Sequence, residues 1–442
     1  MYFRNKLQFF IKMIQELKIS NFLSFKEEVT FSFEATKDTT FEEYQVVQVT
    51  PEVRLLRFAM VYGANASGKS NLLNAIEFLH DFWFDRKNDV TEETGVVPFK
   101  LDKSTPNQPS VFSLKFYVKN VKYWYLLELD EHKVISEKLY YYSSVQPTLL
   151  FDRTLEKKVS VVTFNSAVLK VSAVAREEIN IKCLPNMSFF AARNQVNVAL
   201  PIIDEAREWL KESVMSVVTP NSSLFDYAEH KIHKDDELKE HLLEFIKEAD
   251  FNISGIETKS IKKDIPEEFL DMILKSDRLP DDEKERLKKE KNITQLKTDF
   301  EHTVTNERGI ETYYLSERLQ SEGTRRITGL ESVIYSALQG ESFMVIDEIE
   351  SSLHPNLIEF VLKNFLDKKD NRSQLLITTH YDPLLNEIGG LFRKDSVWFT
   401  EKKESGATEL ISLVEFTGLN RIASLQKAYR SGRFGGIPKI NL

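Results

Sequence analysis

The stretch LLRFAMVYGANASGKS, residues 55–70, joins an apolar run to a loop of small residues. Residues 55–62 are apolar apart from one arginine, which is typical of a strand buried on both faces of a sheet. Beyond the loop, apolar side chains recur at helical spacing, at Leu72, Leu73, Ile76, Leu79 and Trp83. We therefore expect a buried strand, a tight loop and then a helix, the unit from which α/β folds are built.

The loop, residues 63–70, fits the phosphate-binding pattern G-x-x-x-x-G-K-S/T and lies between a strand and a helix, as that pattern requires. Its glycines let backbone N–H groups converge on phosphate oxygens, and the helix N-terminus adds partial positive charge. Lys69 would reach the β and γ phosphates of ATP, while Ser70 would be a ligand of Mg²⁺. The predicted ATP-binding residues are Gly63, Ala64, Asn65, Ala66, Ser67, Gly68, Lys69, Ser70 and Asn71.

A second apolar strand, Phe343–Ile346, ends in two acids, Asp347 and Glu348. At the carboxyl edge of a sheet, Asp347 would lie where phosphate-bound Mg²⁺ sits, and it would share that ion with Ser70. Glu348 would lie next to the γ phosphate, where a carboxylate can polarise an attacking water. We therefore predict Asp347 as a metal ligand and Glu348 as the catalytic general base.

A third apolar strand, residues 374–378, leads to His380, which a parallel sheet would deliver to the same edge. There the imidazole could hydrogen-bond a γ-phosphate oxygen and the attacking water, so His380 is a second predicted catalytic residue. Upstream, LQSEGTRR (residues 319–326) opens an amphipathic helix that is expected over residues 321–338. Ser321 at its start could simply be the N-cap.

The rest of the chain predicts an antiparallel part and a helical part. Apolar and polar residues alternate at period two over residues 14–33, which predicts two strands. Short runs rich in Val, Phe, Tyr and Leu predict an antiparallel meander, with strands over residues 111–118, 123–129, 138–142 and 161–164. Helical spacing dominates residues 175–300. Past residue 310, helix and strand alternate again, with a helix over residues 356–366 and strands near Val397 and Leu410. The expected fold class is α/β.

Composition and charge exclude several classes of protein. A chain of 442 residues with 42% hydrophobic and 29% charged residues, and with only 15 Gly and 13 Pro, is neither collagenous nor largely disordered. No run approaches the roughly 20 apolar residues of a membrane helix, so no membrane is expected as a partner. Cys183, the single cysteine, excludes an internal disulfide and fits a cytoplasmic protein; it is expected to be a small core residue.

The net charge of −9 excludes polyanion binding by the whole surface but leaves room for local basic segments. Residues 421–442 contain Arg and Lys and no acid, so this tail could bind phosphates of DNA, dock on an acidic partner or pack on its own acidic head. His230, His233 and His241 lie in acid-rich helical surroundings that favour solvated histidines over a metal site. Residues 1–12 lack a small-residue cleavage site, so no signal peptide is expected, and Met13 could be the true start.

Together these motifs resemble the ABC-type ATPases of the SMC and RecF class. The order matches: residues 21–25 (NFLSF) resemble the N-terminal strand motif, residues 63–70 the Walker A loop, Ser321, Gly323 and Thr324 the signature, residues 343–348 Walker B, residues 351–355 (SSLHP) the D-loop, and His380 the switch histidine. The L-H-P D-loop and the ending AYRSGRFGGIP, residues 428–438, resemble bacterial phage-defence ATPases of the abortive-infection AbiL/RloA type. Two departures stand out, because Leu23 replaces an arginine found in many relatives and no Q-loop glutamine can be placed before Gln108.

The resemblance implies an ABC-type ATPase head, a mixed sheet with an antiparallel β lobe and a mainly helical insertion. Its expected parts are an ATPase lobe over residues 13–175, the insertion over residues 176–300, a second ATPase lobe over residues 301–415 and a basic tail over residues 416–442. In the class, MgATP is held between the Walker A loop of one protomer and the signature of another, so Ser321, Gly323 and Thr324 would bind ATP in trans. The expected assembly is a homodimer or higher homo-oligomer.

Three functions are compatible with this resemblance. The first is the ATPase sensor of an anti-phage system that acts with a separate effector protein, in related systems often a Toprim nuclease. The second is a DNA repair or replication ATPase that clamps DNA. The third, a nuclease with its own ATPase head, is disfavoured, because the residues after His380 contain no Toprim-like acidic triad and no H-N-H or R-x4-H arrangement. The first two remain open, with DNA as a possible partner.

Overall fold

The computed structural model describes residues 10–249, 252–275 and 281–437. The chain divides into two compact units, which we call the sheet unit and the hairpin unit. The sheet unit lies within Met1–Pro220, Ala337–Ser351 and Val361–Leu442, and the hairpin unit comprises Asn221–Ser336 and Ser352–Phe360. The expected insertion covered residues 176–300. The structure instead places residues 176–220 in the sheet unit and residues 301–336 in the hairpin unit.

A seven-stranded antiparallel sheet forms one layer of the sheet unit. Its strand order is β10-β9-β8-β7-β6-β1-β2, so the two N-terminal strands extend the predicted meander. The strands are β1 (Lys12–Ser20), β2 (Val29–Ser32), β6 (Ser110–Val118), β7 (Val121–Leu129), β8 (Val134–Tyr142), β9 (Thr148–Glu156) and β10 (Val159–Phe164). Met13 is fully buried in β1.

A five-stranded sheet forms the second layer, in the order β14-β15-β5-β16-β17. The first four strands are parallel, and only β17 runs antiparallel to its neighbour. The strands are β5 (Phe58–Tyr62), β14 (Phe343–Ile346), β15 (Gln374–Thr379), β16 (Val397–Lys402) and β17 (Thr408–Ser412). Every residue of β5, β14 and β15 is buried, which explains their unbroken apolar runs.

Helix α2 (Lys69–Phe84) joins the two layers through one continuous apolar core. Its predicted apolar face is buried, and Trp83 stacks on Phe190 with ring centroids 3.7 Å apart. The same core includes Leu17 of the antiparallel sheet and Val61 of the parallel sheet. The other helices of the sheet unit are α1 (Glu42–Gln45), α3 (Ala173–Lys182), α4 (Phe189–Arg193), α5 (Pro201–Ser213) and α12 (Leu425–Arg430).

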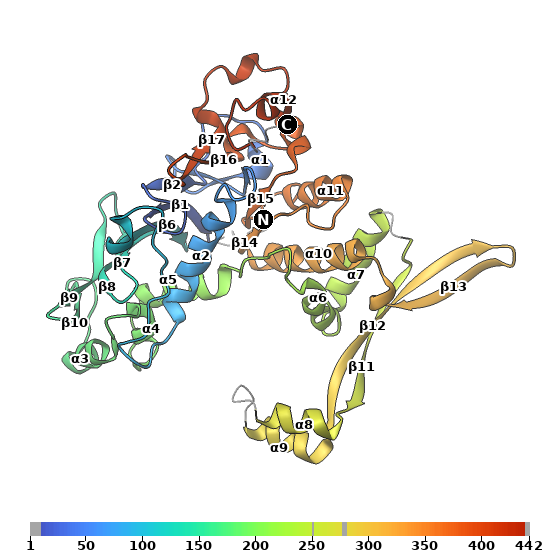
Figure 1. Ribbon diagram of the computed structural model, residues 1–442, viewed down its shortest axis with the longest axis horizontal. Coiled ribbons are helices and arrows are strands. Elements are labelled where there is room, and N and C mark those ends of the chain that lie inside the picture. Colours follow the sequence, from blue (N-terminus) through green and yellow to red (C-terminus); the bar gives the residue numbers. More distant parts are fainter. Residues whose placement is uncertain (1–9, 250–251, 276–280, 438–442) are drawn as a thin grey trace, which may run out of the picture. The chain divides into compact units, whose positions relative to one another are not determined.

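The hairpin unit contains a three-stranded antiparallel sheet that the sequence patterns did not predict. Its strands, yellow to orange in Figure 1, form a long slender ribbon: β11 (Gly255–Asp264), β12 (Asn292–Asn306) and β13 (Gly309–Ser316). Most side chains on both faces are exposed, so the sequence lacks the alternation of apolar and polar residues that indicates a half-buried strand. The helices are α6 (Leu224–Ile232), α7 (Asp236–Glu248), α8 (Glu267–Leu274), α9 (Asp281–Glu290), and parts of α10 (Glu322–Gly340) and α11 (Pro355–Leu366).

Two buried arginines explain where the predicted strands of the sheet unit differ from the observed ones. The run over residues 55–62 divides at Arg57, whose guanidinium donates to the carbonyls of Tyr44 (2.6 Å) and Lys368 (2.9 Å). The residues before it form β4 (Arg54–Leu56), which pairs with β3 (Val46–Gln48) instead. Strand β9 was missed because it contains Arg153, which is buried beside Glu137 at 3.4 Å. A buried ion pair breaks the apolar pattern without breaking the strand.

Candidate functional site

Three parallel strands bring the predicted motifs to one edge of the five-stranded sheet. Ile346 of β14 pairs with Ile377 of β15, and Thr379 of β15 pairs with Tyr62 of β5. The residues that follow these strand ends are Asp347, His380 and Gly63. Because carboxyl ends of parallel strands meet at the same edge, the P-loop (residues 63–70), the acidic pair and the histidine converge, as predicted.

The P-loop is built where a side chain would not fit. A Cβ on Gly68, whose φ is +109°, would lie 2.8 Å from Ser24 Oγ, and one on Gly63 would lie 2.8 Å from the Thr400 carbonyl oxygen. Gly68 caps α2, whose first backbone N–H groups have no partner within the helix. These N–H groups and the helix dipole make the loop a site for anionic phosphates.

Lys69 is the buried cation of this loop. Its Nζ donates to the carbonyl oxygens of Gly63 (2.9 Å) and Ala64 (3.2 Å), which holds the ammonium over the loop. Burial lowers the pKa of Lys69, while the carboxylates of Glu348, Glu350 and Asp347 act in the opposite direction. A buried ammonium held by neutral carbonyl oxygens is stabilised when an anionic phosphate oxygen comes within reach.

The loop is clamped by hydroxyl groups from three distant segments. Ser67 Oγ lies 2.6 Å from Thr400 Oγ1 of β16, and Thr408 Oγ1 of β17 donates to the Ser67 carbonyl at 2.8 Å. Asn71 Nδ2 donates to Ser24 Oγ at 2.7 Å, which ties the N-terminal motif to the start of α2. Thr400 and Thr408 were not predicted, since no local pattern distinguishes them from other strand threonines.

The acidic pair after β14 is held by the strand beside it. Thr378, fully buried in β15, donates its hydroxyl to Asp347 Oδ1 and accepts from the Glu348 backbone N–H at 2.9 Å. Glu348 adopts φ = +48°, a conformation that is costly for a side chain with a Cβ. Such strain is frequent at functional sites, where the surrounding structure imposes it.

Glu350 is a further site residue that the sequence patterns missed. Its Oε1 accepts from the His380 backbone N–H at 2.7 Å and lies 2.9 Å from His380 Nδ1. Its Oε2 is buried without a hydrogen-bond partner among the described residues. The signal was its position two residues after Glu348 in the segment IDEIES. Glu350 thus orients the imidazole of His380, whose other side remains open to solvent.

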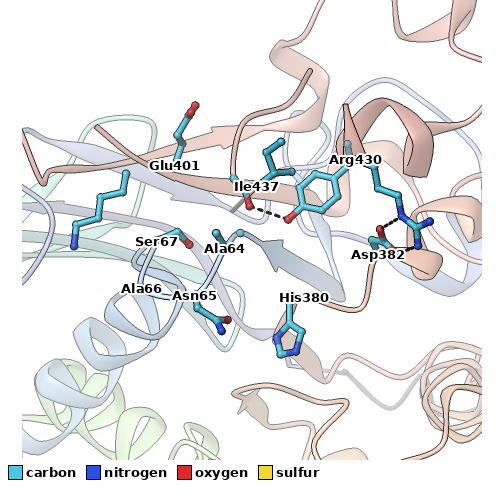
Figure 2. Close-up of a pocket in the computed structure, with 13 residues that line it drawn as sticks. Ala64, Asn65, Ala66, Ser67, His380, Asp382, Glu401, Arg430 and Ile437 are labelled. Atoms are coloured by element: carbon cyan, nitrogen blue, oxygen red, sulfur yellow. Dashed lines mark hydrogen bonds and ion pairs between the residues drawn. The ribbon is translucent and has the colours of Figure 1, made fainter. Parts of the chain in front are cut away.

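A pocket of about 780 Å³ opens beside the P-loop. One side is formed by residues 63–67 and another by His380 and Asp382, as the close-up in Figure 2 shows. The third side comes from the C-terminal segment, through Tyr429, Arg430 and the backbone at Gly436. The pocket therefore joins the predicted phosphate loop, the predicted catalytic histidine and the basic tail, whose role the sequence left open between three alternatives.

Asp347 and Ser70 suit a Mg²⁺ ion that binds together with ATP better than a metal ion bound by protein side chains alone. Asp347 and Ser70 can each supply one oxygen, and no group of three or more His, Cys, Asp or Glu side chains within the described ranges could hold a metal. Mg²⁺ is typically bound by one or two side chains together with substrate phosphates. The buried, unpartnered Oε2 of Glu350 adds negative charge at this edge.

The signature residues lie in the hairpin unit, at the start of α10. Ser321 Oγ accepts from the Thr324 backbone N–H at 3.0 Å, so Ser321 is the N-cap that the sequence allowed. A Cβ on Gly323 would lie 3.1 Å from the carbonyl oxygen of Ser352, which means that the signature turn packs against the D-loop. Ser321 is exposed.

The N-terminal motif plays a structural part. Asn21 is buried and its Nδ2 donates to the carbonyls of Thr105 and Gln108, each at 2.8 Å. Leu23 donates its backbone N–H to the Val97 carbonyl at 2.8 Å. Gln108 itself follows a short 3₁₀ turn and is exposed.

The three histidines considered for a metal site have hydrogen-bond partners nearby. His230 Nδ1 lies 2.8 Å from the Asp226 carbonyl, His233 Nε2 lies 3.1 Å from Ser260 Oγ, and His241 Nε2 lies 2.7 Å from a Glu331 carboxylate oxygen. Cys183 is buried in the main core, as predicted. Within the ranges that the structure describes, no helix is long and apolar enough to cross a membrane.

Comparison with known proteins agrees with this arrangement of motifs. The family model described as "AAA domain, putative AbiEii toxin, Type IV TA system" matches residues 58–167 and 201–386, more than half of the chain. The chain belongs to this family. The match includes the P-loop, the signature, the acidic pair and His380, and it confirms the expected resemblance to P-loop ATPases of the abortive-infection type.

Two solved structures overlap with this AAA-domain chain only loosely. The "SMC head domain from Thermotoga maritima" is 13% identical with a TM-score of 0.40, covering 90% of this chain and 98% of that one. The "SmcHead bound to the C-winged helix domain of ScpA" is 12% identical with a TM-score of 0.44, covering 94% and 99%. No curated protein matches the sequence. Overlap at this level does not bear on activity.

Proposed function

We propose that this protein is a Mg²⁺-dependent ATPase that works as a switch, binding ATP at the P-loop, closing as a homodimer or higher homo-oligomer and opening after hydrolysis. The observation that carries this proposal is the convergence of Lys69, Asp347 and His380 at one edge of the parallel sheet. ATPases of this kind need little covalent chemistry, because positioned charges supply most of the catalysis.

Each residue of the site has a definable part in hydrolysis. Lys69 and the P-loop N–H groups bind the β and γ phosphates, and Asp347 and Ser70 would hold Mg²⁺, which neutralises phosphate charge when bound. Glu348 accepts a proton from the attacking water. His380 presents its free ring nitrogen toward the γ phosphate, because Glu350 holds the opposite side of the ring.

The proposed closure completes the site in trans, with Ser321, Gly323 and Thr324 of one protomer capping ATP on the other. The support is chemical, since the exposed N-terminus of the 19-residue helix α10 offers backbone N–H groups and partial positive charge to a phosphate. Because each protomer has one P-loop and one signature, the assembly would bind two ATP molecules between two chains.

For the biological role, we propose a cytoplasmic sensor ATPase of a bacterial anti-phage system that acts with a separate effector protein such as a Toprim nuclease. The family description, which names a putative toxin of a toxin–antitoxin system, supports a role in defence rather than in metabolism. The alternative is a DNA clamp, which rested on the basic tail. Tyr429 and Phe434 of that tail are buried and stack on Phe399, which weakens the argument for a tail free to bind DNA.

A mixing experiment tests closure in trans. Ser321→Arg should leave ATP binding by a single protomer intact and block turnover, while Lys69→Ala should block both. A mixed dimer retains one intact composite site, so mixing the two inactive proteins should restore part of the hydrolysis.

The matched control is Leu319→Arg, which adds the same side chain two residues earlier at a position that is 69% exposed. It should keep full turnover. If the Ser321→Arg and Lys69→Ala mixture stays inactive although heterodimers are demonstrated, the trans arrangement is wrong.

A further inference from the structure

The C-terminal segment, residues 424–437, forms one wall of the pocket beside the P-loop, and we call it the tail wall. It begins with Ser424, whose hydroxyl caps α12, and it lies beyond residue 386, where the family match ends. Family membership therefore assigns it no role.

The tail wall is a packed element. Tyr429 is buried, with its ring stacked on Phe399 of β16 at 5.6 Å, and Phe434 stacks on the same ring at 5.2 Å. The Tyr429 hydroxyl donates to the Gly436 carbonyl at 2.9 Å, which closes the segment on itself. Burial raises the pKa of Tyr429 to about 12, so this donor stays protonated.

The wall touches the P-loop directly. A Cβ on Gly436, whose φ is +66°, would lie 3.2 Å from Gly63 Cα and 3.0 Å from the Thr400 carbonyl oxygen. The backbone of the wall thus packs on the first glycine of the phosphate loop. Movement of either segment would be felt by the other, because close-packed backbones cannot overlap.

The wall also reaches the residues that follow the catalytic histidine. The Arg430 guanidinium binds Asp382, with Nη2 2.9 Å from Oδ1 and Nε on Oδ2, and both residues line the pocket, as Figure 2 shows. Burial opposes ionisation of Asp382, yet the hydrogen bonds from Arg430 and Gln426 bring its pKa below the ordinary value. Asp382 is therefore an anion that holds Arg430 at the pocket.

The Arg430 guanidinium can exchange Asp382 for another anion. The Arg430 side chain is 63% exposed, and an ion pair open to water is weak. The pair uses Nε and Nη2, so further N–H groups of the planar guanidinium remain for another acceptor. A terminal phosphate offers a higher charge and the fork geometry that guanidinium groups bind best.

We propose that Arg430 senses the terminal phosphate of ATP in cis, exchanging Asp382 for the γ phosphate and thereby coupling the tail wall to the nucleotide state. This inference rests on the proposed ATP site, because it takes residues 63–67 and His380 as the side of the pocket that faces the γ phosphate. ADP lacks that phosphate and leaves the Arg430–Asp382 pair in place. The tail wall would then report ATP, and not ADP, at the surface of the protein.

The test compares two arginines of the same segment. Arg430→Gln should weaken binding of a non-hydrolysable ATP analogue roughly tenfold, the size of one hydrogen bond to a charged group, and leave ADP binding unchanged. Arg430→Lys should retain part of the affinity for the analogue because it keeps the charge. Arg433→Gln, which removes the same charge from a residue that does not line the pocket, should change neither affinity.

Asp382→Asn supplies the reciprocal measurement. It removes the competing anion, so affinity for the analogue should rise while that for ADP stays constant. If Arg430→Gln lowers the affinity for both nucleotides equally, or for neither, the inference is wrong. ATP binding by the wild-type protein would in that case still support the proposed function. A wild-type protein that binds neither nucleotide would refute both.

Discussion

Replacing Gly63 by alanine would place a methyl group inside the clamp that holds the phosphate loop. The new Cβ would lie 2.8 Å from the Thr400 carbonyl oxygen and closer still to Thr400 Oγ1 and Ser67 Oγ. Neither neighbour can turn away freely, because Thr400 Oγ1 is bonded to Ser67 at 2.6 Å and to the Tyr62 carbonyl at 3.2 Å. The loop and β16 must therefore separate.

The cost has two parts. Overpacking a filled site costs about 1–3 kcal/mol, and loss of the Ser67–Thr400 hydrogen bond adds about 1 kcal/mol. A loss of about 2–4 kcal/mol should lower the melting midpoint by about 4 °C or more without unfolding the protein. A displaced phosphate loop should also lower ATP turnover by about 10²-fold, the typical effect of a misplacement of about 1 Å.

Thermal unfolding and steady-state hydrolysis measure these two effects on the same protein. The matched control is Gly390→Ala, because a Cβ there meets nothing nearer than 3.7 Å, an ordinary van der Waals contact. It should melt and turn over as the wild type does. Wild-type turnover in Gly63→Ala, with an unchanged midpoint, would refute the packing argument for the loop.

Two further predictions test the charges of the sheet unit. Lys69→Ala should abolish nucleotide binding measured by calorimetry, because the backbone loop alone leaves the β and γ phosphate charges uncompensated. It should not lower thermal stability, because burial disfavours the charged ammonium. Unchanged ATP affinity would contradict the assignment of Lys69 to the ATP site. Arg153→Met should cost about 3–5 kcal/mol near neutral pH by leaving Glu137 buried and unpaired. Burial already raises the pKa of Glu137 and Arg153 opposes that rise, so in the variant the folded state should hold a proton that the unfolded chain releases. Urea unfolding of Arg153→Met should then show stability falling as pH rises through the folded-state pKa, and a pH-independent, wild-type-like stability would rule this out.

The fold could be predicted where local pattern and tertiary environment agree. Strands β5, β14 and β15 are buried on both faces, so their sequences are unbroken apolar runs, and the polar residues that end them stand out. Strands β11 to β13 carry exposed side chains on both faces and leave no such pattern. Strand β9 was missed for a different reason, since Arg153 is buried in an ion pair that a sequence pattern cannot distinguish from a surface charge.

The candidate site divides in the same way. Lys69, Asp347 and His380 belong to motifs whose spacing is set by local chain geometry. Glu350 and Thr400 act through contacts that depend on how distant strands pair. The position of Glu350 two residues after Glu348 was its one local signal, and Thr400 had none.

The tail wall is the extreme case. Its basic composition is compatible with binding DNA, binding a partner or packing on its own head. Its place beside the P-loop follows only from tertiary contacts, the packing of Gly436 on Gly63 and the Arg430–Asp382 pair.

The most direct test of an ATP-gated switch is the molar mass of Glu348→Gln protein with and without ATP. The substitution keeps the shape and one oxygen of the side chain but removes the charge that polarises water, so hydrolysis should fall by about 10²–10⁴-fold while binding survives. ATP that bridges two protomers stabilises their association by mass action. Light scattering should therefore find a dimer or higher assembly with ATP and a smaller species with ADP or no nucleotide. A mass independent of nucleotide, together with wild-type turnover, would contradict both the role of Glu348 and the gating of assembly by ATP.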